Sequence, residues 1–277
     1  MNLTRESAYQ RTAVDEQQEY LLALRSVSKA FDTGSRSEPD RLVLHDVTFN
    51  LSQAEFISII GPSGCGKSTL LNLISGLDED FTGEISYSEA AGSRLGQIGY
   101  MQQKDLLLPW RTVLDNAALS LELRGVSHSD SRAQASSRLN DFGLAGYASD
   151  YPAQLSGGMR QRVALLRATL AETPLLLLDE PFGALDALTR SEMHGWLIEL
   201  LADSGKSVVL VTHDVDEAIL LSDRVYVMKR DPGRIDTHFD IDIGDRTDPN
   251  VVTSESFTAL KSELLAALRY RDAGGGS

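Results

Sequence analysis

Cysteine is nearly absent from this sequence of 277 residues, and the single Cys65 excludes a disulfide bond within the chain. No stretch approaches the roughly 18 uninterrupted apolar residues that a membrane-spanning helix requires, so we expect the chain not to cross a membrane. The N-terminal region lacks the apolar core of a secretory signal, because residues 5–16 carry charges of both signs. Together these absences predict a protein of the cytoplasm.

Positive charge is scarce as well. The chain has 26 lysine and arginine residues against 40 aspartate and glutamate residues, which gives a formal charge of −14 and a pI near 4.8. This acidic balance argues against a broad surface for a phosphate backbone, and we expect no nucleic-acid partner. The length and the hydrophobic content of 42% suit one large α/β domain, alone or with an appendage.

Residues 61–69 are predicted to form a phosphate-binding loop, because they match the pattern G-x-x-x-x-G-K-[ST] with no misfit. A β-branched and aromatic run at 56–60 precedes them and apolar residues at helical spacing follow at 70–77, so the context is strand, loop and helix. Such a loop points backbone N–H groups and a helix N-terminus at phosphates. Lys67 adds a charge near the β- and γ-oxygens, and the Ser68 hydroxyl can ligate Mg²⁺. The nucleotide-binding residues predicted here are Gly61, Pro62, Ser63, Gly64, Cys65, Gly66, Lys67, Ser68 and Thr69.

A second anion site is predicted where Ser156, Gly157 and Gly158 open a helix. Apolar residues at helical spacing after them supply that helix with a core face. A serine hydroxyl and glycine N–H groups at a helix N-terminus attract anions. One chain therefore has two helix starts that suit phosphate.

Two carboxylates end a predicted buried strand. The four leucines at 175–178 are fenced by prolines and are followed by Asp179 and Glu180, which suits a short strand buried on both faces. Parallel strands place ligands at their carboxyl ends, so Asp179 is predicted to hold Mg²⁺ and Glu180 to act as general base or water-orienting group. In isolation this pair would indicate only a strand-ending turn. His213 ends another apolar run, 207–212, and although a strand-end histidine is more often structural, we expect it at the same sheet edge as Glu180.

The rest of the chain divides into segments. Residues 1–19 are polar and non-periodic and are predicted to form a flexible tail, and the main domain is predicted over 20–240. Helical spacing within this domain indicates an inserted helical subdomain at about 105–165. Residues 241–277 are predicted to be an extension, in which 274–277 resemble an appended glycine-serine linker.

Three local predictions concern secondary structure. A polar helix is expected from about Ser129 to Phe142, and a second helix from Phe257 to Tyr270. The segment 231–234, which contains proline and glycine, is expected to form a hairpin turn.

These motifs, in this order, resemble those of the ATP-binding cassette (ABC) ATPases. The resemblance covers roughly residues 20–240 and includes the phosphate loop, the Ser-Gly-Gly helix start, the leucine strand with its carboxylates, Ala184-Leu185-Asp186 and His213. It implies an α/β fold, with a P-loop ATPase core around a mostly parallel sheet, an N-terminal antiparallel β subdomain and an inserted α-helical subdomain.

The resemblance also implies roles for single residues. Gln103 matches the glutamine between Mg²⁺, the attacking water and the membrane partner, Asp186 the loop that crosses the dimer interface, and His213 the γ-phosphate contact. Phe31 matches the position of the base-stacking aromatic, although by sequence alone it could equally be a half-buried strand residue. The stretch 107–113 resembles importers of the nitrate, sulfonate and taurine type. The implied catalytic residues are Lys67, Gln103, Glu180 and His213, and the implied Mg²⁺ ligands are Ser68, Gln103 and Asp179.

In this family two copies join head to tail, so Ser156 and Gly158 of one copy complete the ATP site of the other. The resemblance therefore implies a Mg²⁺-dependent ATP-hydrolysing subunit of a membrane importer, peripheral to the cytoplasmic face of the cell membrane. The implied partners are a second copy, integral membrane permease subunits and, indirectly, a solute-binding protein. A soluble ABC ATPase in translation or chromosome maintenance is the alternative, which the single cassette and the modest insert disfavour.

Two further predictions concern apolar or reactive residues near the motifs. The apolar cluster at 106–110 follows Gln103 and is either core between the subdomains or part of a groove for a short permease helix. Cys65 lies beside Lys67 and a helix N-terminus, so we expect a reactive thiolate unless the side chain faces the sheet as an inert small residue.

Overall fold

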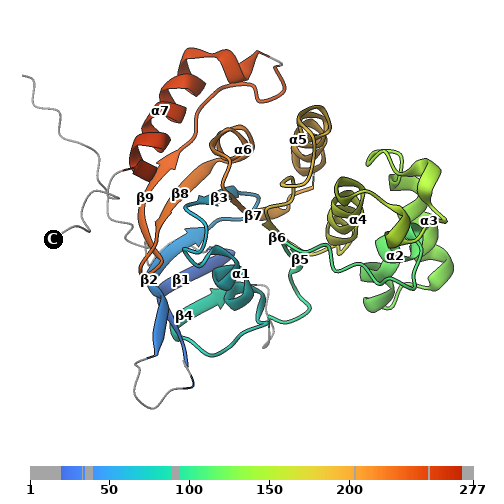
Figure 1. Ribbon diagram of the computed structural model, residues 1–277, viewed down its shortest axis with the longest axis horizontal. Helices are drawn as coiled ribbons and strands as arrows, with labels where there is room; N and C mark the ends of the chain where they lie inside the picture. The colour runs from blue at the N-terminus through green and yellow to red at the C-terminus, as the bar shows by residue number, and fades with distance from the viewer. Residues whose placement is uncertain are drawn as a thin grey trace, which may run out of the picture.

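The computed structural model describes residues 20–32, 34, 40–88, 94–202, 204–248 and 250–269 (Figure 1). The predicted tail at 1–19 and the predicted linker at 274–277 lie outside these ranges.

The N-terminal strands form an antiparallel sheet with the strand order β2-β1-β4. Its members are β1 (Leu22–Phe31), β2 (Arg41–Leu51) and β4 (Thr82–Tyr87). Leu22, Leu24 and Val27 are fully buried, because they face the core that this sheet shares with α1 (Lys67–Ser75). The predicted antiparallel β subdomain is therefore confirmed.

The central sheet has the order β5-β6-β7-β3-β8-β9, and every neighbouring pair is parallel except β8 with β9. Its strands are β3 (Phe56–Ile60), β5 (Gly99–Met101), β6 (Leu175–Asp179), β7 (Ser207–Thr212), β8 (Arg224–Lys229) and β9 (Arg234–Asp240). All residues of β3, β6 and β7 are buried, as their continuous apolar runs predict for strands covered on both faces. The antiparallel pairing of β8 with β9 confirms the predicted hairpin at 231–234.

The predicted helical insert is present and lies at the end of the molecule opposite the antiparallel sheet (Figure 1). It contains α2 (Val113–Leu123), α3 (His128–Arg138) and the start of α4 (Gly157–Thr169), with short 3₁₀ turns at Ala145–Tyr147 and Pro152–Gln154. The prediction that α3 continues to Phe142 was wrong. The chain tightens after Arg138 into turns with i to i−3 hydrogen bonds, and Gly143 takes a positive φ of 62°.

The insert shares one hydrophobic core with the central sheet. Leu114 of α2 and Phe142 belong to the same buried cluster as Leu176 and Leu178 of β6. The Phe142 ring also meets the ring of Trp196, in α5 (Ala187–Ala202), edge to face at 4.1 Å between centroids. This continuous packing holds the insert in a defined position on the sheet.

The C-terminal region packs against the other end of the central sheet. Phe257 and Leu264 of α7 (Glu255–Arg269) are buried with Val225 of β8 and with residues of α6 (Val215–Leu221). The predicted helix near the C-terminus is thus present, and a 3₁₀ turn at Val251–Thr253 leads into it. Within the described part of the chain, no helix combines the length and the apolar character that crossing a bilayer requires.

Candidate nucleotide-binding site

The predicted phosphate loop connects the end of β3 to the start of α1. In the central sheet, β3 lies between β7 and β8. Gly66 has a φ of 100°, and a Cβ atom there would lie 2.6 Å from Leu44 Cδ2. A Cβ atom on Gly61 would lie 2.5 Å from the carbonyl oxygen of Met228 in β8. Glycine is therefore required at both positions, one for its backbone conformation and the other for close packing against β8.

Lys67 is the first residue of α1, and its side chain is buried. Its Nζ atom donates hydrogen bonds to the carbonyl oxygens of Gly61 at 2.8 Å and Pro62 at 3.2 Å. The loop borders a cavity of about 240 Å³ whose lining residues are Val43, Ser63, Gly64, Gly66, Lys67, Ser68, Thr69, Gln103 and Glu180. Sequence reasoning missed Val43, since no motif singles out a valine of β2.

Asp179 is the last residue of β6 and is only 2% exposed. Burial raises the pKa of its carboxyl group, and the nearby Glu180 raises it too, while Ser68 and Lys67 act in the opposite direction. A buried carboxylate beside a hydroxyl and an ammonium group is a place where a bound cation would relieve the cost of desolvation.

Glu180 has a left-handed backbone conformation, with a φ of 50°, while its N–H donates to the carbonyl oxygen of Val211 at 2.8 Å. Such conformations in non-glycine residues cost free energy and are concentrated at functional sites. Gln103 Nε2 donates to Glu180 Oε2 at 3.2 Å, and His213 Nδ1 lies 3.5 Å from Glu180 Oε1. Gln103, Glu180 and His213 follow β5, β6 and β7, and the structure brings their side chains together. His213 therefore lies at the same sheet edge as Glu180, as predicted.

The Ser-Gly-Gly helix start lies outside this cavity. Ser156 caps α4, and its Oγ atom accepts a hydrogen bond from the N–H of Met159 at 3.2 Å. Ser156 and Gly157 are exposed. A Cβ atom on Gly158 would lie 3.1 Å from Leu185 Cδ2, so the residue before Asp186 packs closely on this helix start.

Asp186 organises the beginning of α5. Its carboxylate accepts hydrogen bonds from the N–H of Thr189 at 3.0 Å and from the Thr189 hydroxyl at 2.7 Å. These hydrogen bonds lower the pKa of the exposed Asp186 carboxyl group. The preceding Leu185 packs on the Ser-Gly-Gly helix start, and Asp186 does not line the phosphate-loop cavity.

Phe31 ends β1, and its side chain is exposed rather than part of the core. Lys29 Nζ lies 4.9 Å from the centroid of the Phe31 ring, within the range of a cation–π contact. The same ammonium group forms ion pairs with Asp78 at 3.0 Å and Asp80 at 3.1 Å. Sequence reasoning did not identify Lys29, because both aspartates are about 50 residues away along the chain.

The structure does not support the prediction that Cys65 is a reactive thiolate. The residue is 2% exposed, and a Cβ atom on Gly61 would lie 3.0 Å from its Sγ atom. Burial raises the pKa of the Cys65 thiol, and this effect outweighs the opposite influence of Lys67, whose Nζ lies 3.9 Å from Sγ. The structure therefore supports the alternative, a small residue that packs inside the loop.

We expect Cys65 to react slowly with iodoacetamide, because alkylation requires an accessible thiolate. Intact-mass measurements at pH 7 should show labelling at least about tenfold slower than that of a free cysteine, both with and without MgATP. The Cys65→Ala variant should retain ATP turnover. Rapid labelling that MgATP suppresses would contradict this expectation and restore the reactive thiolate.

A glycine loop between a central parallel strand and a helix, with two carboxylates two strands away, defines a P-loop nucleotide-binding protein. The family model described as ABC transporter matches residues 44–183. The chain belongs to this family.

Several curated relatives resemble the chain over most of its length. The formylaminopyrimidine import ATP-binding protein ThiZ of Halalkalibacterium halodurans is 41% identical over 250 residues, which covers 90% of this chain and 96% of the relative. The aliphatic sulfonates import ATP-binding protein SsuB 1 of Rhodococcus jostii is 50% identical over 190 residues, or 68% of this chain and 74% of the relative.

Solved structures show the same fold. The ATP-binding cassette MJ0796, described as a dimer in a post-hydrolysis state bound to ADP and Pi, superimposes with a TM-score of 0.72 at 33% identity. The match covers 80% of this chain and 99% of that cassette. The predicted cassette fold is therefore confirmed, as is the resemblance on which it rested.

Proposed function

We propose that this chain hydrolyses ATP to drive a membrane importer, as one copy of a head-to-tail dimer bound to a permease. The observation that carries the proposal is the convergence of Lys67, Gln103 and Glu180 on one cavity beside the phosphate loop. The names of the relatives support the transport role, since both are import ATP-binding proteins. Those names differ in solute, which agrees with a subunit that supplies energy and does not contact the solute.

The phosphates of ATP are assigned to the loop. Lys67 Nζ now bonds to two loop carbonyl oxygens, and in this proposal phosphate oxygens take over part of that contact. The exposed Phe31 ring supplies a face for the base. The remaining loop residues assigned to the nucleotide are Gly61, Pro62, Ser63, Gly64, Cys65, Gly66, Ser68 and Thr69.

Ser68, Asp179 and Gln103 are suited to hold a magnesium ion. Asp179 is a buried carboxylate whose pKa is raised by its surroundings, and a nearby cation would favour its charged form. No cluster of three or more His, Cys, Asp or Glu side chains suited to a metal occurs in the part of the chain that the structure describes. Mg²⁺ is usually held by one or two protein ligands together with phosphates. Ser68, Asp179 and Gln103 would hold the ion, which when bound neutralises charge on the phosphate oxygens.

Glu180 is assigned the role of orienting the attacking water and accepting its proton. Its two carboxylate oxygens are held from two sides, one by the Gln103 amide and the other near His213. His213, whose side chain is 62% exposed, is assigned the contact with the γ-phosphate. Hydrolysis then depends mainly on positioning and on electrostatic stabilisation of the transferred phosphoryl group.

The second anion site is assigned to the ATP of the other copy. Ser156 and Gly157 are exposed and lie outside the cavity of their own chain, as a site completed by a second copy requires. The similar cassette MJ0796 is described as dimeric. Asp186, which lies beside this helix start, is assigned to the same interface. Closure then depends on ATP, and hydrolysis allows the two copies to separate.

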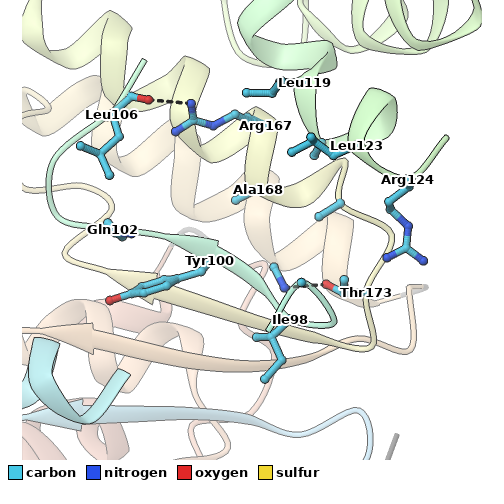
Figure 2. Close-up of a pocket in the computed structure, with 14 residues that line it drawn as sticks. Ile98, Tyr100, Gln102, Leu106, Leu119, Leu123, Arg124, Arg167, Ala168 and Thr173 are labelled. Carbon is cyan, nitrogen blue, oxygen red and sulfur yellow. Dashed lines mark hydrogen bonds between the residues drawn. The ribbon is translucent and has the colours of Figure 1, made fainter. Parts of the chain in front are cut away.

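A groove of about 370 Å³ is the proposed docking surface for a short helix of the permease. Figure 2 shows Leu119 and Leu123 of α2 on one side of the groove and Ile98 and Tyr100 on the other. Leu123 is 80% exposed and Leu106 is 50% exposed, so the groove presents apolar surface to solvent.

The residues of the predicted apolar cluster at 106–110 differ in their exposure to solvent. Leu107 is buried in the core, whereas Leu106 lines the groove and Trp110 is 72% exposed. Leu107 thus agrees with the core interpretation, and the exposure of Leu106 and Trp110 supports the proposal of a docking groove. The exposed residues support docking of the permease here, and through it a position at the cytoplasmic face of the membrane.

Replacing both Leu106 and Leu123 with serine is expected to weaken binding of the permease by about 10²-fold or more, since each leucine that is buried on docking contributes about 1.5–3 kcal/mol. ATP binding to the chain should stay within about twofold, because neither side chain lines the loop cavity. The measurement is copurification of the chain with coexpressed integral membrane permease subunits, followed by solute uptake into proteoliposomes.

The matched control is Val252→Ser, which removes an apolar side chain of 45% exposure outside the groove. This variant should copurify and transport like the parent. Normal uptake by the double leucine variant would contradict the docking assignment. A parent chain that binds no permease would favour the alternative of a soluble ABC ATPase.

A further inference from the structure

Helix α4, which begins at the second anion site, also forms hydrogen bonds with the segment that follows Gln103. Arg160, in the first turn of α4, donates from Nε to Asp105 Oδ2 at 2.9 Å. The same guanidinium donates from Nη1 to the carbonyl oxygen of Leu155 at 2.8 Å. One planar side chain thus joins Asp105 to the residue immediately before Ser156.

A second arginine of α4 holds the backbone of the same segment. Arg167 donates from Nη2 to the carbonyl oxygen of Asp105 at 2.7 Å and from Nη1 to that of Leu106 at 2.9 Å. Figure 2 shows the bond to Leu106 at the groove. Burial lowers the pKa of Arg167, yet Asp105 acts to raise it. The Asp105 segment is therefore held to α4 through both its side chain and its backbone.

In the proposed dimer, the two segments joined by Arg160 lie near different nucleotides. Gln103, two residues before Asp105, is bonded to Glu180 at the ATP site of its own chain. Ser156, beside Leu155, faces the ATP of the other copy. The Asp105–Arg160 ion pair therefore joins the segment after Gln103 to the helix start at Ser156 within one chain.

We propose that Asp105 is a positioning residue that, through Arg160, sets the Ser156 anion site relative to Gln103 and so couples ATP binding in one site to closure over the other. This inference rests on the proposed function, because it requires an ATP site shared between two copies. Asp105 does not line the phosphate-loop cavity, so the effect of its charge is assigned to the guanidinium of Arg160.

The expected effect is modest in size. The side chains of Arg160 and Asp105 are 36% and 31% exposed, and ion pairs of this exposure contribute little because solvent screens them. Breaking the pair is therefore expected to raise the MgATP concentration for half-maximal dimerisation by roughly two- to fivefold.

The test uses the full chain with Glu180→Gln, in which the ATP-bound dimer should persist, and follows dimerisation by light scattering during a MgATP titration. Asp105→Asn removes the charge but keeps an oxygen for the local bond from the N–H of Leu107. The midpoint should rise two- to fivefold. Affinity for a fluorescent ATP analogue, measured where the chain is monomeric, should not change. Asp105→Glu should recover part of the loss.

The matched control is Asp141→Asn, which breaks the Arg138–Asp141 pair in the same subdomain, with side chains 40% and 35% exposed. That pair lies within one local turn and should leave the midpoint unchanged. In an Arg160→Gln background, Asp105→Asn should have no additional effect if both residues act through one contact.

Three outcomes would count against the inference. A midpoint unchanged by Asp105→Asn would overturn it alone, and so would an equal shift in the Asp141→Asn control, which would indicate general loosening of the subdomain. Failure of the parent Glu180→Gln chain to dimerise with MgATP would instead overturn the shared site, and with it both the proposed dimer and this inference.

Discussion

Replacing Glu180 with glutamine is expected to lower the rate of ATP hydrolysis by about 10²-fold or more, while ATP still binds. A loss of this size corresponds to about 3 kcal/mol of activation free energy. Glutamine retains the shape of the side chain and an oxygen that can accept the bond from Gln103, but it cannot take a proton from water. The measurement is steady-state phosphate release, together with equilibrium binding of ATP.

The same variant should accumulate as an ATP-bound dimer, because closure requires ATP and reopening requires hydrolysis. Size-exclusion chromatography with light scattering should show the dimer with MgATP and the monomer without it. The control Glu199→Gln makes the same charge change at an exposed position of α5 and should behave like the parent. Phosphate release that stays within a few-fold of the parent would remove Glu180 from the catalytic role.

Much of this fold follows from local patterns. The apolar runs at 56–60, 175–178 and 207–212 are all buried strands. The run at 175–178 consists of leucine, which favours helices over strands. For 175–178, the pairing of β6 with β5 and β7 on its two sides overrides the local preference. The positions of the phosphate loop and of the second helix start were also predictable, because each glycine motif is followed by apolar residues at helical spacing.

Contacts between distant segments were not predictable. Val43 lines the loop cavity because β2 packs beside the loop, where Gly233 exchanges backbone hydrogen bonds with residues 43 and 45. Arg160 and Asp105 are 55 residues apart, and no sequence pattern relates them. The reactivity predicted for Cys65 is not supported for a related reason. Its charged neighbour is visible in the sequence, whereas the burial that dominates the pKa of its thiol comes from tertiary packing.

The role of the second helix start can be tested by a pair of variants that preserve its structure. Ser156 caps α4 through its Oγ atom, and aspartate and asparagine are equally good capping residues. Both Ser156→Asp and Ser156→Asn should therefore fold normally and bind ATP at the loop of their own chain. They differ only in charge, and that charge would face the γ-phosphate bound to the other copy.

Ser156→Asp is expected to abolish ATP-driven dimerisation and to lower turnover by on the order of 10²-fold or more, since two negative charges about 4 Å apart near a protein surface repel by about 4 kcal/mol. Ser156→Asn should retain most of both activities. Light scattering in the Glu180→Gln background and phosphate release in the parent background measure the two effects. If the aspartate variant dimerised and turned over ATP as well as the asparagine variant, no γ-phosphate would lie at Ser156, because a carboxylate at a helix N-terminus is otherwise stabilising. The head-to-tail arrangement would then have to be replaced by one in which α4 faces away from the nucleotide.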